Sequence, residues 1–183
     1  DIGIRPSWEQ AMDDVKKAGG KVHREPSDIP GVGRFSVVAD PQGAVFMLLQ
    51  PNGSDQPPVA MGTPGHIGWR ELMATDWQPA LDFYSGQFGW KKDTSIDMGE
   101  MGIYQLFSVD GAQNGGMMNR PPNMPSPAWQ FYFNVPAIDA AAKRVTGGGG
   151  TITFGPMEVP GGQWAMNCMD PQGAHFGLVA PVR

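Results

Sequence analysis

The sequence predicts an α+β protein built from repeated βαβββ units, and three observations support this prediction. Glycine and proline, at 26 and 18 of 183 residues, make up close to a quarter of the chain, which suits many short strands joined by turns. Tryptophan, phenylalanine and methionine are too frequent for a disordered chain. The third observation is an internal repeat, which indicates the order of the elements.

The repeat is centred on the segment DPQGA, which occurs at 40–44 and again at 170–174. About fifteen identities fall in this one gap-free register, more than chance gives in so short a segment. The others pair Ala11 with Ala141, Val15 with Val145, Gly19-Gly20 with Gly149-Gly150, Pro26 with Pro156, Pro30-Gly31 with Pro160-Gly161, and Phe46, Leu48 and Pro51 with Phe176, Leu178 and Pro181. We therefore expect two parts of the chain to share one local fold.

Each copy predicts a short strand, an amphipathic helix and turn-separated strands. In the first copy a strand opens the chain, Ser7 with Gln10 forms a capping box, and Gly19-Gly20 ends the helix. Its apolar positions, at helical spacing, are Trp8, Ala11, Met12, Val15 and Ala18. In the second copy Pro136 suits an early helix position, and the glycines of 147–150 end the helix. We expect strands there at 151–154, 163–169 and 174–180.

The middle of the chain predicts a third, more divergent unit. Its first strand covers 66–74, Asp76 is a good N-cap, and the helix 77–88 ends at Gly89. Further strands are expected at about 91–98, 102–109 and 113–118. The three units then span residues 1–51, 65–118 and 128–183, and residues 52–64 form a linker.

Composition excludes several classes of protein. The net charge of -5 argues against a basic nucleic-acid surface. No apolar run is long enough to cross a membrane, and the one cysteine, Cys168, allows no intrachain disulfide and suggests a buried, inert thiol. No signal peptide opens the sequence, so we expect a cytoplasmic protein.

Four stretches together resemble the vicinal oxygen chelate superfamily, the glyoxalase / bleomycin-resistance / extradiol-dioxygenase proteins. They are WRELMATD at 69–76, FYSGQFGW at 83–90, the GG helix stops, and DPQGA followed by a final strand. The resemblance implies that two units pair into a module whose curled mixed sheet encloses a cleft. Residues 65–183 would form one module, and 1–51 the second half of an N-terminal module whose first half is missing. Pairing with that missing segment or a homodimer would complete it.

The resemblance also implies positions for a divalent metal, on the first and last strands of each unit. These positions correspond to Trp69, Met118, Gln130 and Gly177. Tryptophan, methionine and glycine offer no side-chain oxygen or nitrogen ligand of the kind such ions bind. We therefore expect no metal cofactor, which argues against metal-dependent isomerisation and dioxygenation.

Strand alternation predicts which side chains line the cleft. If Trp69 points inward, so do Glu71 and Met73. In the last unit the inward residues are then Gln130, Tyr132 and Asn134 on its first strand, and His175 and Gly177 on its last strand. Desolvation of Glu71 between Trp69 and Met73 should raise its pKa and suit it to act as a general base. A structural Glu71, bonded to backbone or to Arg70 or Arg120, is the alternative.

The other candidates have more modest roles. Tyr132 is expected to polarise a carbonyl and His175 to transfer protons, while Tyr104 and Trp164 could stack on a flat ligand. The remaining ligand-binding candidates are Trp69, Met73, Met118, Gln130 and Asn134. The alternative is a structural role: packing is the more common one for the aromatic and methionine residues, and a surface or edge position for His175.

Three functions remain open from the sequence. The first is a metal-independent or weakly metal-dependent lyase or isomerase that acts on a small oxygenated or aromatic metabolite with Glu71 as base. The second is a non-catalytic drug or metabolite binder of the bleomycin-resistance type. The third is a module kept for association with another chain. No nucleic acid or membrane partner is expected.

Overall fold

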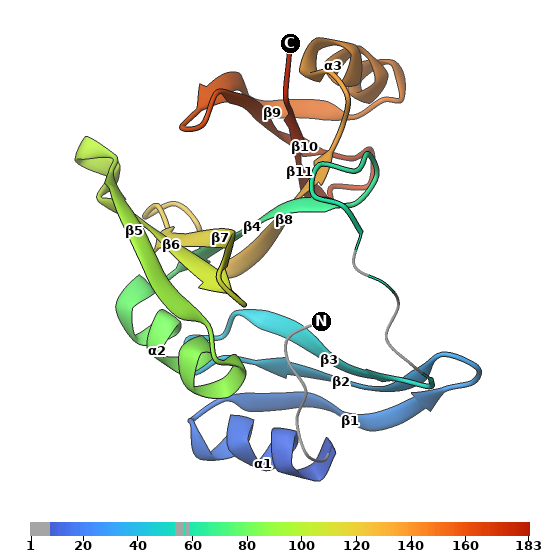
Figure 1. Cartoon of the computed structure of the whole chain (residues 1–183), viewed down its shortest axis with the longest axis vertical. Helices are drawn as coiled ribbons and strands as arrows, with labels where there is room; N and C mark the ends of the chain where they lie inside the picture. The colour runs from blue at the N-terminus through green and yellow to red at the C-terminus, as the bar shows by residue number, and fades with distance from the viewer. Residues whose placement is uncertain (1–7, 54–56, 58) are drawn as a thin grey trace. The chain divides into compact units, whose positions relative to one another are not determined.

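The computed structural model describes residues 8–53, 57 and 59–183, and the chain forms two compact units. Unit 1 comprises residues 1–56 and 72–129, and unit 2 comprises 57–71 and 130–183. The strands form two hydrogen-bonded sheets (Figure 1). One has three strands in the order β1-β2-β3, and the other has eight strands in the order β5-β6-β7-β4-β8-β11-β10-β9. Since β8 and β11 run parallel and β10 and β11 antiparallel, the larger sheet is mixed.

The elements follow the predicted order. They are α1 (Trp8–Lys17), β1 (Lys21–Ile29), β2 (Gly33–Ala39), β3 (Val45–Pro51), β4 (Ile67–Ala74), α2 (Trp77–Phe88), β5 (Lys91–Asp97), a 3-10 turn (Gly99–Met101), β6 (Ile103–Val109), β7 (Ala112–Asn119), β8 (Ala128–Asn134), α3 (Ile138–Gly147), β9 (Thr151–Val159), β10 (Gln163–Met169) and β11 (His175–Ala180). This confirms the α+β class and the βαβββ order for the second and third units. The first strand of the first unit and Ser7 lie outside the described residues.

The repeated DPQGA segment is a turn that an aspartate side chain holds closed. Asp40 Oδ1 accepts the backbone N–H groups of Gln42 and Ala44, both at 2.9 Å. Asp170 Oδ1 accepts those of Gln172 and Ala174, both at 2.8 Å. An aspartate can satisfy two backbone donors in this way, which is why the turn favours this residue.

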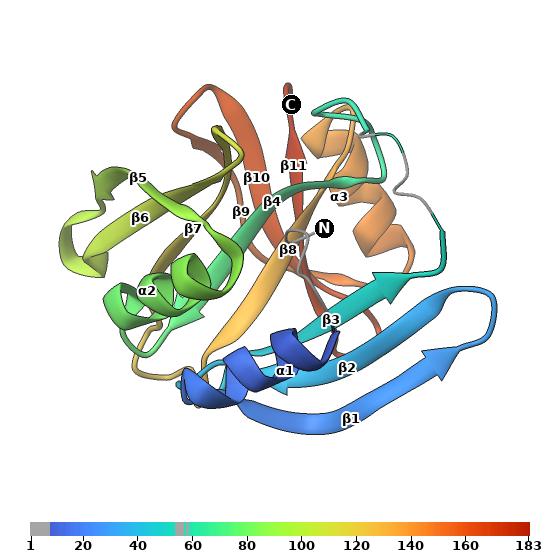
Figure 2. The ribbon, with the colours of Figure 1, turned by 60° about the horizontal axis from the view of Figure 1, so that its bottom comes forward.

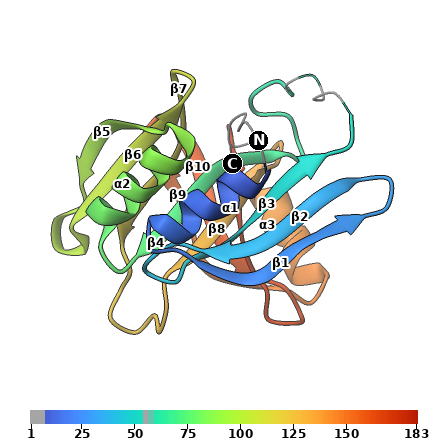
Figure 3. The ribbon, with the colours of Figure 1, turned by 90° about the horizontal axis from the view of Figure 1, so that it is seen from below.

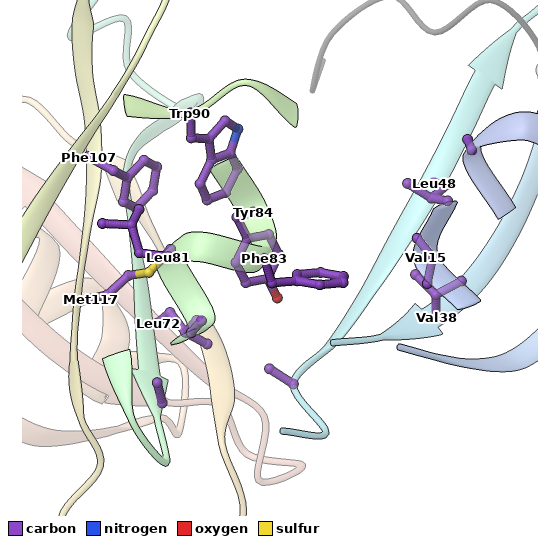
Figure 4. Packing of buried hydrophobic residues seen from close by; sticks show 14 of the residues in the cluster. Val15, Val38, Leu48, Leu72, Leu81, Phe83, Tyr84, Trp90, Phe107 and Met117 are labelled. Atoms are coloured by element: carbon purple, nitrogen blue, oxygen red, sulfur yellow. The ribbon is translucent and has the colours of Figure 1, made fainter. Parts of the chain in front are cut away.

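Helix α2 has the two ends that its sequence predicts. Asp76 accepts the backbone N–H of Gln78 and starts the helix, and Gly89 ends it with a left-handed φ of 73°. The helix buries Leu81, Phe83 and Tyr84, and Figure 4 shows these side chains with Trp90, Phe107 and Met117 in one cluster. The Trp90 and Phe107 rings stack at 4.3 Å between centroids, so aromatic packing contributes strongly to the core of unit 1.

The DPQGA turn at 40–44 and strand β3 hold α2 through polar and aromatic contacts. The Tyr84 hydroxyl donates to Asp40 Oδ2 at 3.1 Å, and the Gln42 amide pairs with both the backbone N–H and C=O of Asp76, at 2.9 and 2.6 Å. The Phe46 ring meets the Phe83, Tyr84 and Phe88 rings edge to face. Helix α1, on one face of β1-β2-β3 (Figure 3), joins the same cluster through Val15.

Unit 2 has a separate core between α3 and its strands (Figure 2). It consists of Ile138, Ala141, Met166, Cys168, Leu178 and Ala180. Burial raises the pKa of the Cys168 thiol, so the thiolate is disfavoured and the cysteine behaves as a small apolar residue. None of the helices formed by the described residues is long and apolar enough to cross a membrane.

Replacement of Asp40 with Ala should destabilise the protein far more than replacement of Asp170 with Ala. Asp40 is 3% exposed and accepts both turn donors and the Tyr84 hydroxyl, so its loss should cost about 3 kcal/mol. Asp170 is half-buried and accepts only the two backbone donors of its own turn. Its loss should lower the free energy of unfolding by about 1 kcal/mol. Urea unfolding of the two variants measures the difference, and equal losses would contradict the role given to Tyr84.

Candidate functional site

Strands β10 and β11 of unit 2 present one face to α3 and the other away from it. Met166 and Cys168 on β10 and Leu178 on β11 belong to the core beneath α3. Because side chains alternate along a strand, Asn167 and Gly177 point to the opposite face. The face on which Gly177 lies is thus the one away from α3, and its predicted position in a cleft stays a prediction.

A row of four residues crosses this opposite face. Strand pairing places Gly177 opposite Tyr132 on β8 and opposite Asn167 on β10, and Asn167 opposite Phe154 on β9. A Cβ atom at Gly177 would lie 2.2 Å from Tyr132 Cδ1. The Tyr132 ring therefore lies over the glycine and occupies the space that any side chain at position 177 would need.

The Tyr132 hydroxyl meets a buried carboxylate. Tyr132 donates a hydrogen bond of 3.1 Å to Oε1 of Glu71, which is only 9% exposed. Both residues belong to unit 2. A buried carboxylate needs donors to replace water, and the phenol supplies one. We refer to Glu71, Tyr132, Asn167 and Gly177 as the Glu71 site.

The environment keeps Tyr132 protonated. Burial raises its pKa far above the ordinary value, and the negative charge of Glu71 and the hydrogen bond to it raise it further. A hydrogen bond with the Asn167 side chain acts in the opposite direction and is a smaller effect. Tyr132 is therefore a lasting hydrogen-bond donor to Glu71 rather than a proton source near neutral pH.

Other predicted residues of unit 2 occupy varied surroundings. Asn134 is buried and donates from its side chain to the His66 carbonyl at 3.2 Å, so its amide supports the strand ends. Trp164 packs against the core beneath α3, with the Arg183 guanidinium 4.8 Å from its ring. His175 is exposed at the start of β11. The ligand-binding and proton-transfer roles predicted for them stay predictions.

Gln130 shares the face of Tyr132, two residues along β8. Its Nε2 is buried, and no acceptor among the described residues reaches it. Buried amide donors are normally paired, so this atom is suited to meet an acceptor on a ligand or a water. Trp69, half-buried on β4, also belongs to unit 2.

The three remaining candidates belong to unit 1. Met73 and Met118 are half-buried on β4 and β7. Tyr104 on β6 lies over Gly116, where a Cβ atom would be 2.3 Å from its ring. Tyr104 and Tyr132 are thus each placed over a glycine of a neighbouring strand, in different units.

Two residues of the row escaped the sequence analysis. Asn167 lies on the predicted strand 163–169, and its alternation with Met166 and Cys168 was the signal that could have identified it. Phe154 is 58% exposed, and only the register of β9 with β10 brings it opposite Asn167. A register shift in that pairing hides Phe154 from a simple alternation rule.

The residues at the expected metal positions do not fit a divalent cation. The place of a ligand side chain at Gly177 is filled by the Tyr132 ring, and Trp69 and Met118 offer no hard donor. Among the described residues, no group of three histidine, cysteine, aspartate or glutamate side chains could hold an ion. The chemistry of the Glu71 site is therefore derived without a metal.

Comparison with known proteins places the chain in a family. Residues 63–178 match the model of the Glyoxalase/Bleomycin resistance protein/Dioxygenase superfamily. The chain belongs to this superfamily. It is 31% identical over 191 residues to CFP32 of Mycobacterium tuberculosis, a protein named as a glyoxylase, covering 98% of this chain and 72% of CFP32. It is 33% identical to the anthracycline biosynthesis protein DnrV of Streptomyces peucetius, covering 90% of this chain and 59% of DnrV.

Solved structures of superfamily proteins share the fold. The Mn(II)-bound glyoxalase of Novosphingobium aromaticivorans aligns with a TM-score of 0.66 and 19% identity, over 96% of this chain and 59% of the glyoxalase. The 2,3-dioxygenase LapB of Pseudomonas sp. KL28 aligns with a TM-score of 0.63 and 13% identity, over 94% of this chain and 66% of LapB. At these identities the likeness concerns the fold alone.

Replacement of Gly177 with Ala should disrupt the Glu71 site. The added methyl group would overlap the Tyr132 ring, which must move away and lengthen its bond to Glu71, at a cost of about 1–3 kcal/mol. Gly147→Ala is the matched control, because a Cβ atom there meets nothing within 4 Å. Thermal unfolding of both variants checks this, and a neutral Gly177→Ala would contradict the placement of Tyr132.

Stability above pH 10 should depend on Tyr132. The folded-state pKa of Tyr132 is raised above its ordinary value of 10.0. The stabilisation that the protonated phenol gives to the folded protein is therefore fully present below pH 10 and is lost as the pH rises further. The free energy of unfolding should fall less steeply above pH 10 in Tyr132→Phe than in the unchanged protein. Urea unfolding at about pH 8 and about pH 10.5 measures both slopes, and identical slopes would contradict the buried phenol.

Proposed function

We propose that the chain binds a small oxygenated or aromatic metabolite at the Glu71 site and removes a proton from it, in a metal-independent reaction of the lyase or isomerase kind. The observation that carries this proposal is the buried Glu71 carboxylate held by the Tyr132 hydroxyl at 3.1 Å. A fixed carboxylate in a place with little water is the common form of a general base.

The side chains in and beside the Glu71 site have separate parts in this reaction. Glu71 would accept a proton from a carbon next to a carbonyl, while Tyr132 fixes the orientation of the carboxylate through its hydrogen bond. The amides of Gln130 and Asn167 are donors suited to the oxygen on which negative charge develops. Phe154, exposed at the end of the row, offers an apolar surface for the rest of the ligand.

A second function, non-catalytic binding of the bleomycin-resistance type, rests on a different observation. The positions that chelate metal in the family hold Trp69, Met118, Gln130 and Gly177. These residues are better suited to contact an apolar or aromatic ligand than to coordinate a metal ion. The relative DnrV, which is named for anthracycline biosynthesis, supports a flat polycyclic ligand class. A cytoplasmic location suits both functions.

The proton-transfer function can be tested without a known substrate. The protein is incubated in D2O with a panel of small α-hydroxyketones and aromatic ketones, and NMR follows the exchange of the hydrogen next to the carbonyl. We expect exchange that survives a metal chelator and falls at least about 100-fold in Glu71→Gln. Tyr132→Phe should reduce exchange less, because it leaves the carboxylate in place.

The control is ligand binding by the same variants, followed by thermal shift. Glu71→Gln should still bind the compounds that the unchanged protein binds. Binding without exchange would support the non-catalytic binder instead. Exchange that persists in Glu71→Gln, or disappears with the chelator, would contradict the proposed role of Glu71.

A further inference from the structure

We propose that Asn52 is a site of spontaneous deamidation, in which the backbone of the next residue, Gly53, converts the asparagine into aspartate and isoaspartate. The chain contains two Asn-Gly pairs, at 52–53 and at 114–115, and the fold leaves only the first of them free to react. The proposal concerns the covalent chemistry of the backbone and does not depend on the Glu71 site.

The reaction requires no partner other than water. The backbone nitrogen of Gly53 attacks the side-chain carbonyl carbon of Asn52, and the side-chain amide leaves as ammonia with the proton of the attacking nitrogen. The product is a succinimide ring, which water opens at either of its two carbonyl carbons. One opening gives aspartate, and the other gives isoaspartate, in which the chain runs through the side-chain carbon.

The surroundings of Asn52 and Gly53 permit this attack. Both residues are exposed and follow the last residue of β3, outside any helix or strand. Within the described part of the chain, the Gly53 N–H donates to no acceptor and the Asn52 side chain forms no hydrogen bond. Gly53 has a φ of 120°, which glycine adopts without a steric penalty, and a Cβ atom there would meet nothing within 4 Å. The attacking nitrogen can therefore approach the amide carbon.

The backbone before the reacting pair is fixed. The Asn52 N–H donates to the Val32 carbonyl at 2.8 Å, and Pro51 is paired with Gly33 at the end of the β2-β3 ladder. Deamidation changes only the Asn52 side chain and its link to Gly53. The ladder of unit 1 therefore keeps its hydrogen bonds in the product, and the change is one added negative charge and, in isoaspartate, one added backbone carbon.

The second Asn-Gly pair lies in a contrasting place. Asn114 is half-buried and Gly115 is buried in β7, a strand that lies between β6 and β4 in its sheet. Gly115 is paired with Phe107 of β6, and Asn114 lies at a register shift of that pairing. Neighbouring strands on both sides hold this backbone in place, so the Gly115 nitrogen cannot turn toward the Asn114 amide carbon. A misplacement of about 1 Å is enough to slow a reaction by about 100-fold.

Incubation of the folded protein in a mildly alkaline buffer tests the proposal, because the attacking nitrogen must lose its proton. Mass spectrometry of the peptides follows the replacement of the amide by an acid at each site. We expect Asn52 to convert at least about 100-fold faster than Asn114. In concentrated urea, where the fold no longer holds the second pair, the two sites should convert at similar rates.

Two variants serve as controls in anion-exchange chromatography. Asn52→Asp gives the elution position of a chain with the added negative charge. Asn52→Gln keeps the side-chain amide but lengthens the side chain, so that attack would require a larger ring, and it should not form the later-eluting species. Equal conversion of Asn52 and Asn114 in the folded protein would overturn the proposal. Formation of that species by Asn52→Gln as fast as by the unchanged protein would also overturn it.

Discussion

The hydrogen bond between Tyr132 and Glu71 is the interaction on which the proposed site depends. It requires Gly177, because only glycine leaves room for the ring. It also requires that β8 and β11 pair in the register that places Tyr132 opposite Gly177. The solved glyoxalase that shares this fold is Mn(II)-bound, whereas this chain has a buried carboxylate and a phenol at the Glu71 site. The proposed chemistry rests on those two groups.

A related arrangement organises unit 1. There the Tyr84 hydroxyl meets Asp40, and Trp129 donates to the same hydroxyl at 3.0 Å. Burial and the Asp40 charge raise the pKa of Tyr84, so it too stays protonated. Asp40, however, also closes its turn and lies within the aromatic core, which makes this pair a structural one. The two tyrosine–carboxylate pairs show that the same contact can fasten a helix or shape a site.

The sequence predicted the fold closely because its signals are local. Helix α2 begins after Asp76 and ends at Gly89, as capping rules require, and the DPQGA repeat marks two equivalent turns. The site was harder to predict, because it depends on pairing between distant strands. Alternation predicts that Tyr132 and Gly177 share a face, and the pairing of β8 with β11 places them opposite each other. The contact of Tyr132 with Glu71, however, spans 61 positions, and Phe154 pairs with Asn167 next to a register shift. No local pattern encodes either contact.

The central claim is that Glu71 and Tyr132 act as one coupled pair. A double-mutant cycle with Glu71→Gln, Tyr132→Phe and the combined variant measures this coupling directly through the free energy of unfolding. We predict that the double variant is more stable than the sum of the single losses implies, by about 1–3 kcal/mol. Losses that simply add would show that the two groups do not interact, and would contradict the account.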